Sequence, residues 1–306
     1  EATGRITFTR EQIEINQLRG VGPSGATVTV NGTVTPPGDG AQVKLRIVAD
    51  DMPIDEHLIA AMEPKHRKAL AFCADEQAYQ KLLDTGLIRA DADQPGDAPV
   101  FTLGGTTRLE VDVHRPRGDE ADYRVTTAID LDGMGVLFKP WPYPMTTTGG
   151  TLRLTPGRVF VDKVTAVGPT GAKARMHGTV DYARSGPARI SPNLTITNAT
   201  APLDSLLIAS LGDKRAAWLE QVGLSGTASA KAVIDHDEDQ GVGFVVHANV
   251  TDAQANPFQG AAVIKNLTGG VTIKRNHVLL RELTGSLADA PVTLTGEGDF
   301  SQATPE

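Results

Sequence analysis

Residues 20–34 read GVGPSGATVTVNGTV, a glycine-rich turn followed by alternating apolar and polar residues. Alternation with a period of two is typical of a β-strand with one apolar face and one solvated face. Glycine, proline and serine immediately before it are typical of a tight turn. The stretch therefore predicts a hairpin, and a hairpin predicts antiparallel pairing.

The same alternation continues along most of the chain, interrupted by further short turns at 37–40, 155–157 and 168–171. Such short connections favour a mainly antiparallel sheet. We expect a mainly β fold, a curved and twisted antiparallel sheet. Alternating stretches lie at 6–9, 28–30, 109–113, 152–154, 244–246, 271–273 and 292–294.

Two regions instead carry apolar residues at helical spacing, one at about 55–86 and one at 204–222. Proline lacks a backbone N–H and clashes with the preceding helical turn, so Pro64 should split the first region. Helix starts favour Asp, and helix ends favour Gly. We expect N-caps at Asp204 and Asp213, and helix ends at Gly86, Gly212 and Gly223.

The opening stretch recurs 146 residues later, where residues 166–180 read AVGPTGAKARMHGTV. Further on, MPIDEHLIAAM at 52–62 matches APLDSLLIASL at 201–211, and Gly149-Gly150 returns as Gly269-Gly270. Recurrence at a long period indicates a repeat architecture. We expect units at 1–102, 103–223 and 224–306 along one continuous elongated sheet, the third incomplete. Native arrays have atypical terminal repeats, so we interpret the chain as a piece of a longer one.

Composition excludes several classes of protein. The 306 residues carry a net charge of −8, which disfavours a nucleic-acid binder. A single cysteine excludes an internal disulfide framework. No apolar run is long enough for a transmembrane helix, and no signal peptide is visible. Aromatic residues make up only 5%, which is few for a thick interior.

The chemical motifs favour ordinary structural roles. Gly20-x-Gly22-x-x-Gly25 matches the dinucleotide-binding pattern, but a strand follows it rather than a helix, so we interpret it as a turn. The acidic run at 235–239 is interpreted as a solvated hairpin tip, and Cys73 as a small buried hydrophobe. The seven histidines show no metal-ligand spacing. We expect no enzyme activity, no metal and no cofactor.

The segment 140–144 reads PWPYP. It could be a polyproline ligand for a partner domain. A stiff connector with its aromatic side chains wedged onto the sheet edge fits better, because 256–258 reads NPF at the equivalent place in the second unit.

Together, the Gly-Gly strand openings, the Asn31-Gly32-Thr33 and His177-Gly178-Thr179 strand ends, and the segment 203–222 with Trp218 before Gly223 resemble the AsmA-like, TamB-related proteins of the bacterial envelope. The resemblance covers roughly residues 4–300. It implies a β-sheet forming an open apolar groove, a periplasmic location with a membrane anchor outside this chain, and conduction of phospholipids between inner and outer membranes. Membrane-anchored partner proteins at the ends are also implied.

The residues themselves support such a groove, because an apolar sheet face must be covered by another layer or by a ligand. Two short helical regions are too little to cover it. We therefore expect phospholipid or other acyl-chain lipids to bind there. The alternatives are a second sheet that closes the groove, and a structural periplasmic scaffold that binds a protein partner along its edge. The expected lipid-binding residues are Ile6, Phe8, Val28, Val30, Leu109, Val111, Leu152, Leu154, Val271 and Ile273.

Overall fold

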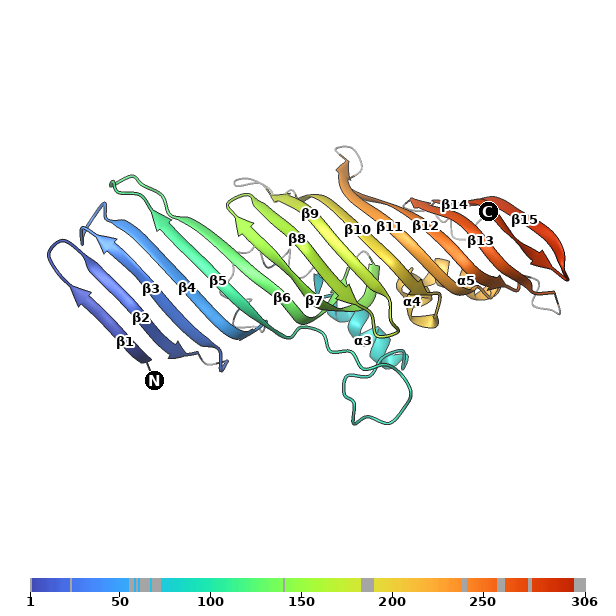
Figure 1. The fold of residues 1–306 in the computed structure, drawn as a ribbon, viewed down its shortest axis with the longest axis horizontal. Helices are drawn as coiled ribbons and strands as arrows, with labels where there is room; N and C mark the ends of the chain where they lie inside the picture. The colour runs from blue at the N-terminus through green and yellow to red at the C-terminus, as the bar shows by residue number, and fades with distance from the viewer. Residues whose placement is uncertain are drawn as a thin grey trace.

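The chain forms one long antiparallel sheet in which the strands pair in chain order (Figure 1). The computed structural model describes residues 2–22, 24–54, 58, 60, 67, 73–139, 141–182, 190–237, 241–257, 262–274 and 277–299. Within them lie fifteen strands. The mainly β, antiparallel fold predicted from the alternation is confirmed. The strands are β1 Ala2–Phe8, β2 Ile13–Val21, β3 Thr27–Thr35, β4 Gln42–Pro53, β5 Thr106–Arg115, β6 Arg124–Phe138, β7 Trp141–Thr155, β8 Arg158–Val167, β9 Lys173–Tyr182, β10 Ile190–Pro202, β11 Ser225–Asp237, β12 Gly241–Ala255, β13 Ile264–Lys274, β14 His277–Leu287 and β15 Ala290–Asp299.

The two copies of the opening stretch form the same hairpin turn. The Gly22 N–H donates to the Ala26 carbonyl at 2.8 Å, and the Gly168 N–H donates to the Ala172 carbonyl at 2.7 Å. Both turns connect adjacent antiparallel strands, β2 with β3 and β8 with β9. The interpretation of the glycine pattern as a turn is therefore confirmed.

The two helical regions also begin alike. In both, a backbone hydrogen bond joins the start of the region to the strand that follows the helices. The Ile54 N–H donates to the Gly105 carbonyl at 3.1 Å, and the Leu203 N–H donates to the Gly226 carbonyl at 2.9 Å. Gly105 and Gly226 both have positive φ, +139° and +131°. The division into three units stays a prediction.

Three helices lie between strands: α3 Glu76–Asp84, α4 Ser205–Ser210 and α5 Asp213–Val222. In the first helical region Leu58, Ala60, Arg67 and Cys73 are also helical, while Pro64 lies outside the described residues. The Asp204 carboxylate accepts from the Leu207 N–H at 2.8 Å, so the predicted N-cap is confirmed. Gly223 ends α5 with φ +60°.

The predicted N-cap at Asp213 is wrong, because Gly212 occupies that place and Asp213 is the first helical residue. Gly212 has φ +85°, a conformation that glycine adopts without strain, and this sharp turn separates α4 from α5. The Asp213 carboxylate instead forms an ion pair with Lys81 of α3, in which Nζ and Oδ1 are 2.5 Å apart.

Residues 141–144 of the PWPYP segment are neither a connector nor an edge element, while Pro140 lies outside the described residues. Trp141 begins β7, which pairs with β6 and β8 in the middle of the sheet. Tyr143 is buried, and its ring stacks on Trp141 with centroids 5.5 Å apart. The pairing with β6 shifts register between Leu137 and Phe138. A proline lacks the N–H that a regular ladder needs, so it is tolerated where the ladder is irregular.

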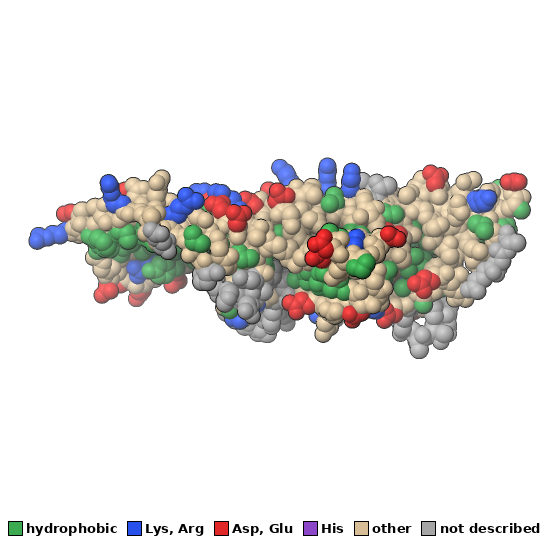
Figure 2. All heavy atoms as spheres, turned by 90° about the horizontal axis from the view of Figure 1, so that it is seen from below, with side chains coloured by type: hydrophobic (Ala, Val, Ile, Leu, Met, Phe, Trp, Pro, Cys, Tyr) green, Lys and Arg blue, Asp and Glu red, His purple; other side chains and the backbone are tan. Residues whose placement is uncertain are grey.

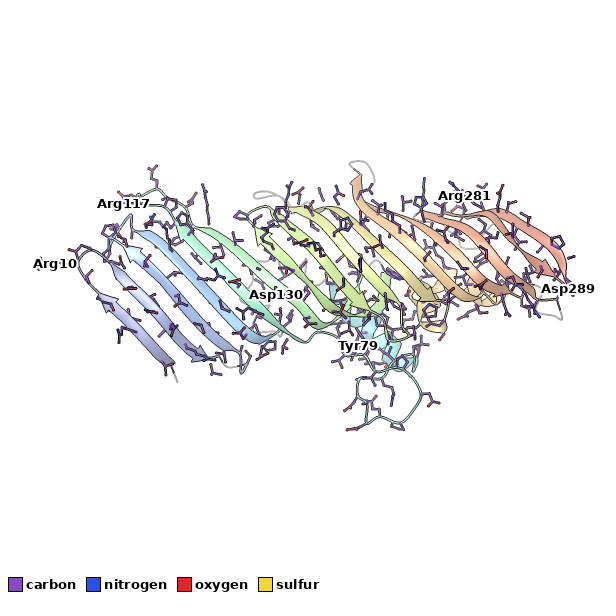
Figure 3. All side chains as sticks on the ribbon, in the orientation of Figure 1. Arg10, Tyr79, Arg117, Asp130, Arg281 and Asp289 are labelled. Carbon is purple, nitrogen blue, oxygen red and sulfur yellow. The ribbon has the colours of Figure 1, made fainter. Side chains whose placement is uncertain are left out.

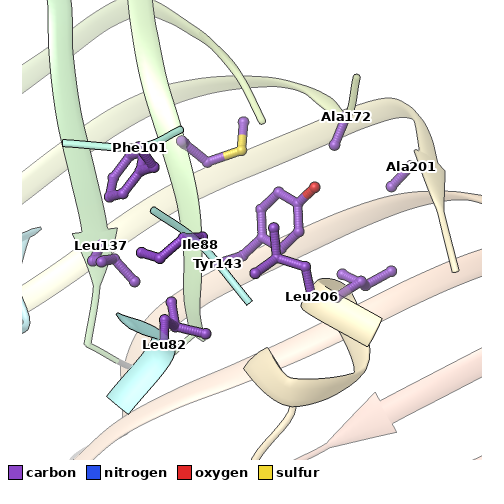
Figure 4. Close-up of a cluster of buried hydrophobic side chains, with 10 residues drawn as sticks. Leu82, Ile88, Phe101, Leu137, Tyr143, Ala172, Ala201 and Leu206 are labelled. Atoms are coloured by element: carbon purple, nitrogen blue, oxygen red, sulfur yellow. The ribbon is translucent and has the colours of Figure 1, made fainter. Parts of the chain in front are cut away.

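The first hydrophobic cluster packs α3 and α4 against the ends of β6 and β7 (Figure 4). Leu82 of α3, Leu206 of α4 and Tyr143 of β7 are buried members of this cluster. A second cluster runs along β6 to β11, and a third joins the end of α5 to β12, β13 and β14. The helices therefore cover one end of the strands and leave the remainder of their length uncovered by any helix that the structure describes.

Gly178 in β9 gives a direct test of the close strand packing. Its φ is +142°, and an added Cβ would lie 2.1 Å from the Asn193 carbonyl oxygen of β10. We expect Gly178→Ala to lower the free energy of unfolding by about 1–3 kcal/mol, through strain and overpacking. Urea denaturation followed by circular dichroism measures this.

The matched control is Gly296→Ala in β15, where an added Cβ meets nothing within 4 Å. That substitution should leave the urea midpoint nearly unchanged. Equal midpoints for the two variants would contradict the packing argument.

Candidate functional site

The strand register places all ten predicted binding residues on the same side of the sheet. Val28 lies opposite Ala49, Ala49 opposite Leu109, and Leu109 opposite Ile129, which in turn faces Leu152. Directly paired residues of neighbouring strands project to the same face. We call this side the apolar face. It is defined by Ile6, Phe8, Val28, Val30, Leu109, Val111, Leu152, Leu154, Val271 and Ile273 and the residues in register with them.

One row of side chains follows this face across the sheet from β3 to β12. Every member is aliphatic, glycine or phenylalanine, so the row carries no charge and no side-chain hydrogen-bonding group. Its members in strand order are Val28, Ala49, Leu109, Ile129, Leu152, Val161, Gly178, Leu194, Ile234 and Phe244.

The ten predicted residues differ in how far they are exposed. Phe8 is 70% exposed and Ile6 is 43% exposed, near the N-terminal end of the sheet. The other eight, from Val28 to Ile273, are half-buried. Seen along its edge, the sheet carries hydrophobic side chains below it at the N-terminal end and around the helices (Figure 2). The apolar face is thus neither a sealed interior nor a fully solvated surface.

The alternative of a second covering sheet is wrong for the part of the chain that is described, since all its strands belong to a single sheet. Leu206 and Leu207 of α4 cover the apolar face near Tyr143 and Met145. The Tyr143 hydroxyl lies 2.9 Å from the Thr170 hydroxyl, which closes this covered end. Burial raises the pKa of Tyr143, because it disfavours the phenolate.

The opposite side, the polar face, carries charged residues in ion pairs. Arg108 Nη1 lies 2.6 Å from Asp50 Oδ1, and Arg46 pairs with Glu110. Arg153 stacks on the Phe160 ring at 4.8 Å. Charged side chains also project from the turns, as Arg10 and Arg117 do (Figure 3). The two faces therefore differ sharply in chemistry.

Several residues of the apolar face were missed by reading the alternation. Val161 and Val164 share that face although they are three residues apart, because an extra residue, Lys163 with φ +49°, forms a bulge between them. The bulge breaks the period of two locally. Ile47 and Leu45 in β4 do alternate cleanly and could have been chosen from the sequence.

Within the described residues, no three or more His, Cys, Asp or Glu side chains gather closely enough to hold a metal ion. His57 and His66 lie outside that part. No helix among the described segments is long and apolar enough to cross a membrane. Comparison with protein-family models, curated proteins and solved structures gives no match.

Cys73, predicted to be a small buried hydrophobe, is half-buried, and burial raises the pKa of its thiol to about 11. Only about one thiol in a thousand would then be ionised at pH 8. We expect iodoacetamide to alkylate Cys73 at pH 8 far more slowly in the folded protein than in urea, as measured by intact mass. Equal rates in the two conditions would contradict this burial effect.

Proposed function

We propose that this protein binds the acyl chains of lipids along its apolar face and does not act as an enzyme. The observation that carries the proposal is the uncharged row from Val28 to Phe244, which crosses ten strands in unbroken register. Half of its members are half-buried, and the others, Ala49, Ile129, Val161, Leu194 and Ile234, are buried. An apolar surface that stays partly exposed over many strands is typical of a binding surface. A long, narrow apolar row matches the shape of an acyl chain.

The energetics favour an extended apolar ligand. Each buried methylene contributes about 0.8 kcal/mol, so a chain of a dozen methylenes gains several kcal/mol even after ordering costs. Val30, Ile47 and Val111 form a parallel row beside the first. Where the first row crosses β7, at Leu152, it lies away from Tyr143 and Met145, near which α4 packs. A lipid lying here would keep its headgroup in water.

Conduction of lipids follows if an acyl chain can move along the first row, which contains no polar side chain from β3 to β12; the second row meets Thr127 in β6. We propose this role in a periplasmic, AsmA-like envelope protein that moves phospholipids between inner and outer membranes. The resemblance of the turn and helix motifs supports that assignment, together with the continuous sheet.

The test introduces a charge on the apolar face. Val111 in β5 is half-buried and lies between Ile47 and Thr127. We expect Val111→Lys to remove most of the lipid that co-purifies, because an ammonium cannot be desolvated against an acyl chain. Organic extraction followed by mass spectrometry, normalised to protein, measures the bound lipid. Leu109→Lys and Leu154→Lys should act in the same way.

The matched control is Val48→Lys on the neighbouring strand. Val48 is equally half-buried, but it projects from the polar face directly opposite Glu110. It should retain lipid at the wild-type level with an unchanged circular dichroism spectrum. Lipid recovery from Val111→Lys that equals the control, or wild-type protein that carries no lipid, would overturn the proposal and favour the scaffold alternative.

A further inference from the structure

A cluster of basic side chains occupies the polar face in the C-terminal half of the sheet. Thr197 of β10 pairs with Arg175 and with Lys231, and Lys231 pairs with His247. In the adjacent row, Lys274 pairs with Val245. We call the set Arg175, His177, Lys231, His247 and Lys274 the basic stripe, and all five residues are exposed.

Between β9 and β13 the two rows of the stripe contain no carboxylate. Farther along, the rows reach Asp162 in the β8 bulge and Glu297 and Asp299 in β15, and Asp235 lies in the row beside them. The two rows from β9 to β13 hold, besides the basic residues, only threonine and valine: Thr195, Thr197, Val233, Val245 and Thr272. Among the described residues, Arg175, Lys231 and Lys274 make no ion pair. The cations Arg46, Arg108 and Arg158 of the preceding strands are each paired with a carboxylate.

This contrast has a physical consequence. The electrostatic potential of unpaired cations extends about 10 Å from the surface at moderate salt, even on a chain whose net charge is negative. Strands lie about 4.8 Å apart, so Arg175 and Lys231 stand about 10 Å from one another across the sheet. The charges are thus spread over a broad surface rather than gathered in a pocket.

The types of side chain in the stripe distinguish between nucleic acid and other anionic partners. Sheets that bind single-stranded nucleic acid present aromatic side chains for base stacking. The two rows contain no Phe, Tyr or Trp. Hydroxyl groups lie among the cations instead, and His247 Nδ1 lies 3.2 Å from the Thr272 hydroxyl. A broad area of cations and hydroxyls suits closely spaced phosphate groups without bases.

We propose that the basic stripe docks the polar face on an anionic phospholipid membrane surface. Lys and Arg side chains, with Asp and Glu among them, project from the side of the sheet opposite the helices, so the described elements leave this approach open (Figure 2). Contact with the membrane surface through this side leaves the apolar face directed away from it. The docking does not depend on acyl-chain binding.

The experiment measures sedimentation with vesicles of phosphatidylcholine containing phosphatidylglycerol, and with vesicles of phosphatidylcholine alone. We expect binding to the anionic vesicles only, decreasing as salt is added. Each Lys or Arg near such a surface contributes about fivefold in partitioning. The double variant Arg175→Glu/Lys231→Glu should therefore weaken binding by at least about 25-fold.

The matched control is Lys44→Glu/Arg124→Glu. These residues are also exposed, lie on the polar face and stand two strands apart in one row, with His114 between them. Their row includes Glu14, and Asp112 lies in the row beside it. The control makes the same change in net charge and should keep vesicle binding within about twofold of wild type.

Three results would overturn the inference: equal losses in the two double variants, equal binding to both kinds of vesicle, or binding to heparin or single-stranded DNA without binding to anionic vesicles. Co-purified lipid is measured without vesicles. Acyl-chain binding and membrane docking can therefore each fail without the other.

Discussion

The rest of the structure depends on the phase of the alternation between apolar and polar side chains across neighbouring strands. A slip of one residue in any strand would move all its apolar side chains to the polar face. The bulges prevent such a slip from accumulating. At Lys163 the extra residue lies in β8 alone, so Val161 still aligns with Gly178 and Val164 aligns with Met176. The apolar face stays continuous because each irregularity is absorbed within one strand.

Among the described residues no second sheet faces this one, and the helices pack near one end of the strands, so lateral pairing stabilises most of its length. Each interior strand is hydrogen-bonded on both sides, and each bulge adds right-handed twist. The helices then supply a local core at one end, where Leu82, Leu206 and Tyr143 are buried in one cluster. The same strands carry this covered end and, farther along, the second cluster, in which the apolar-face residues Ile129, Val161 and Leu194 are buried. Part of the apolar face is therefore buried and part is exposed.

Sequence reasoning predicted what depends on local pattern. The alternation at 109–113 and 152–154 predicted strands that the structure contains, with their apolar residues on one shared face, and Asp204 and Gly223 gave correct helix limits. It failed where tertiary context decides. Proline rules argue against a central strand, yet residues 141–144 form part of β7, because a register shift absorbs the missing hydrogen bonds. Ile129 and Leu194 also lie in regular alternation, at 129–132 and 193–198, and could have been chosen from the sequence.

The glycines of the apolar face limit where a guest could lie. Small residues on this side suggest free space, but Gly32 and Gly178 provide none, since an added Cβ would lie 2.2 Å from the Lys44 carbonyl oxygen and 2.1 Å from the Asn193 carbonyl oxygen. The neighbouring strand already occupies that volume. Because they lack a Cβ, these glycines let neighbouring strands approach one another closely. Any depth available to an acyl chain therefore comes from alanines such as Ala232 and Ala248, which keep regular pairing on both sides.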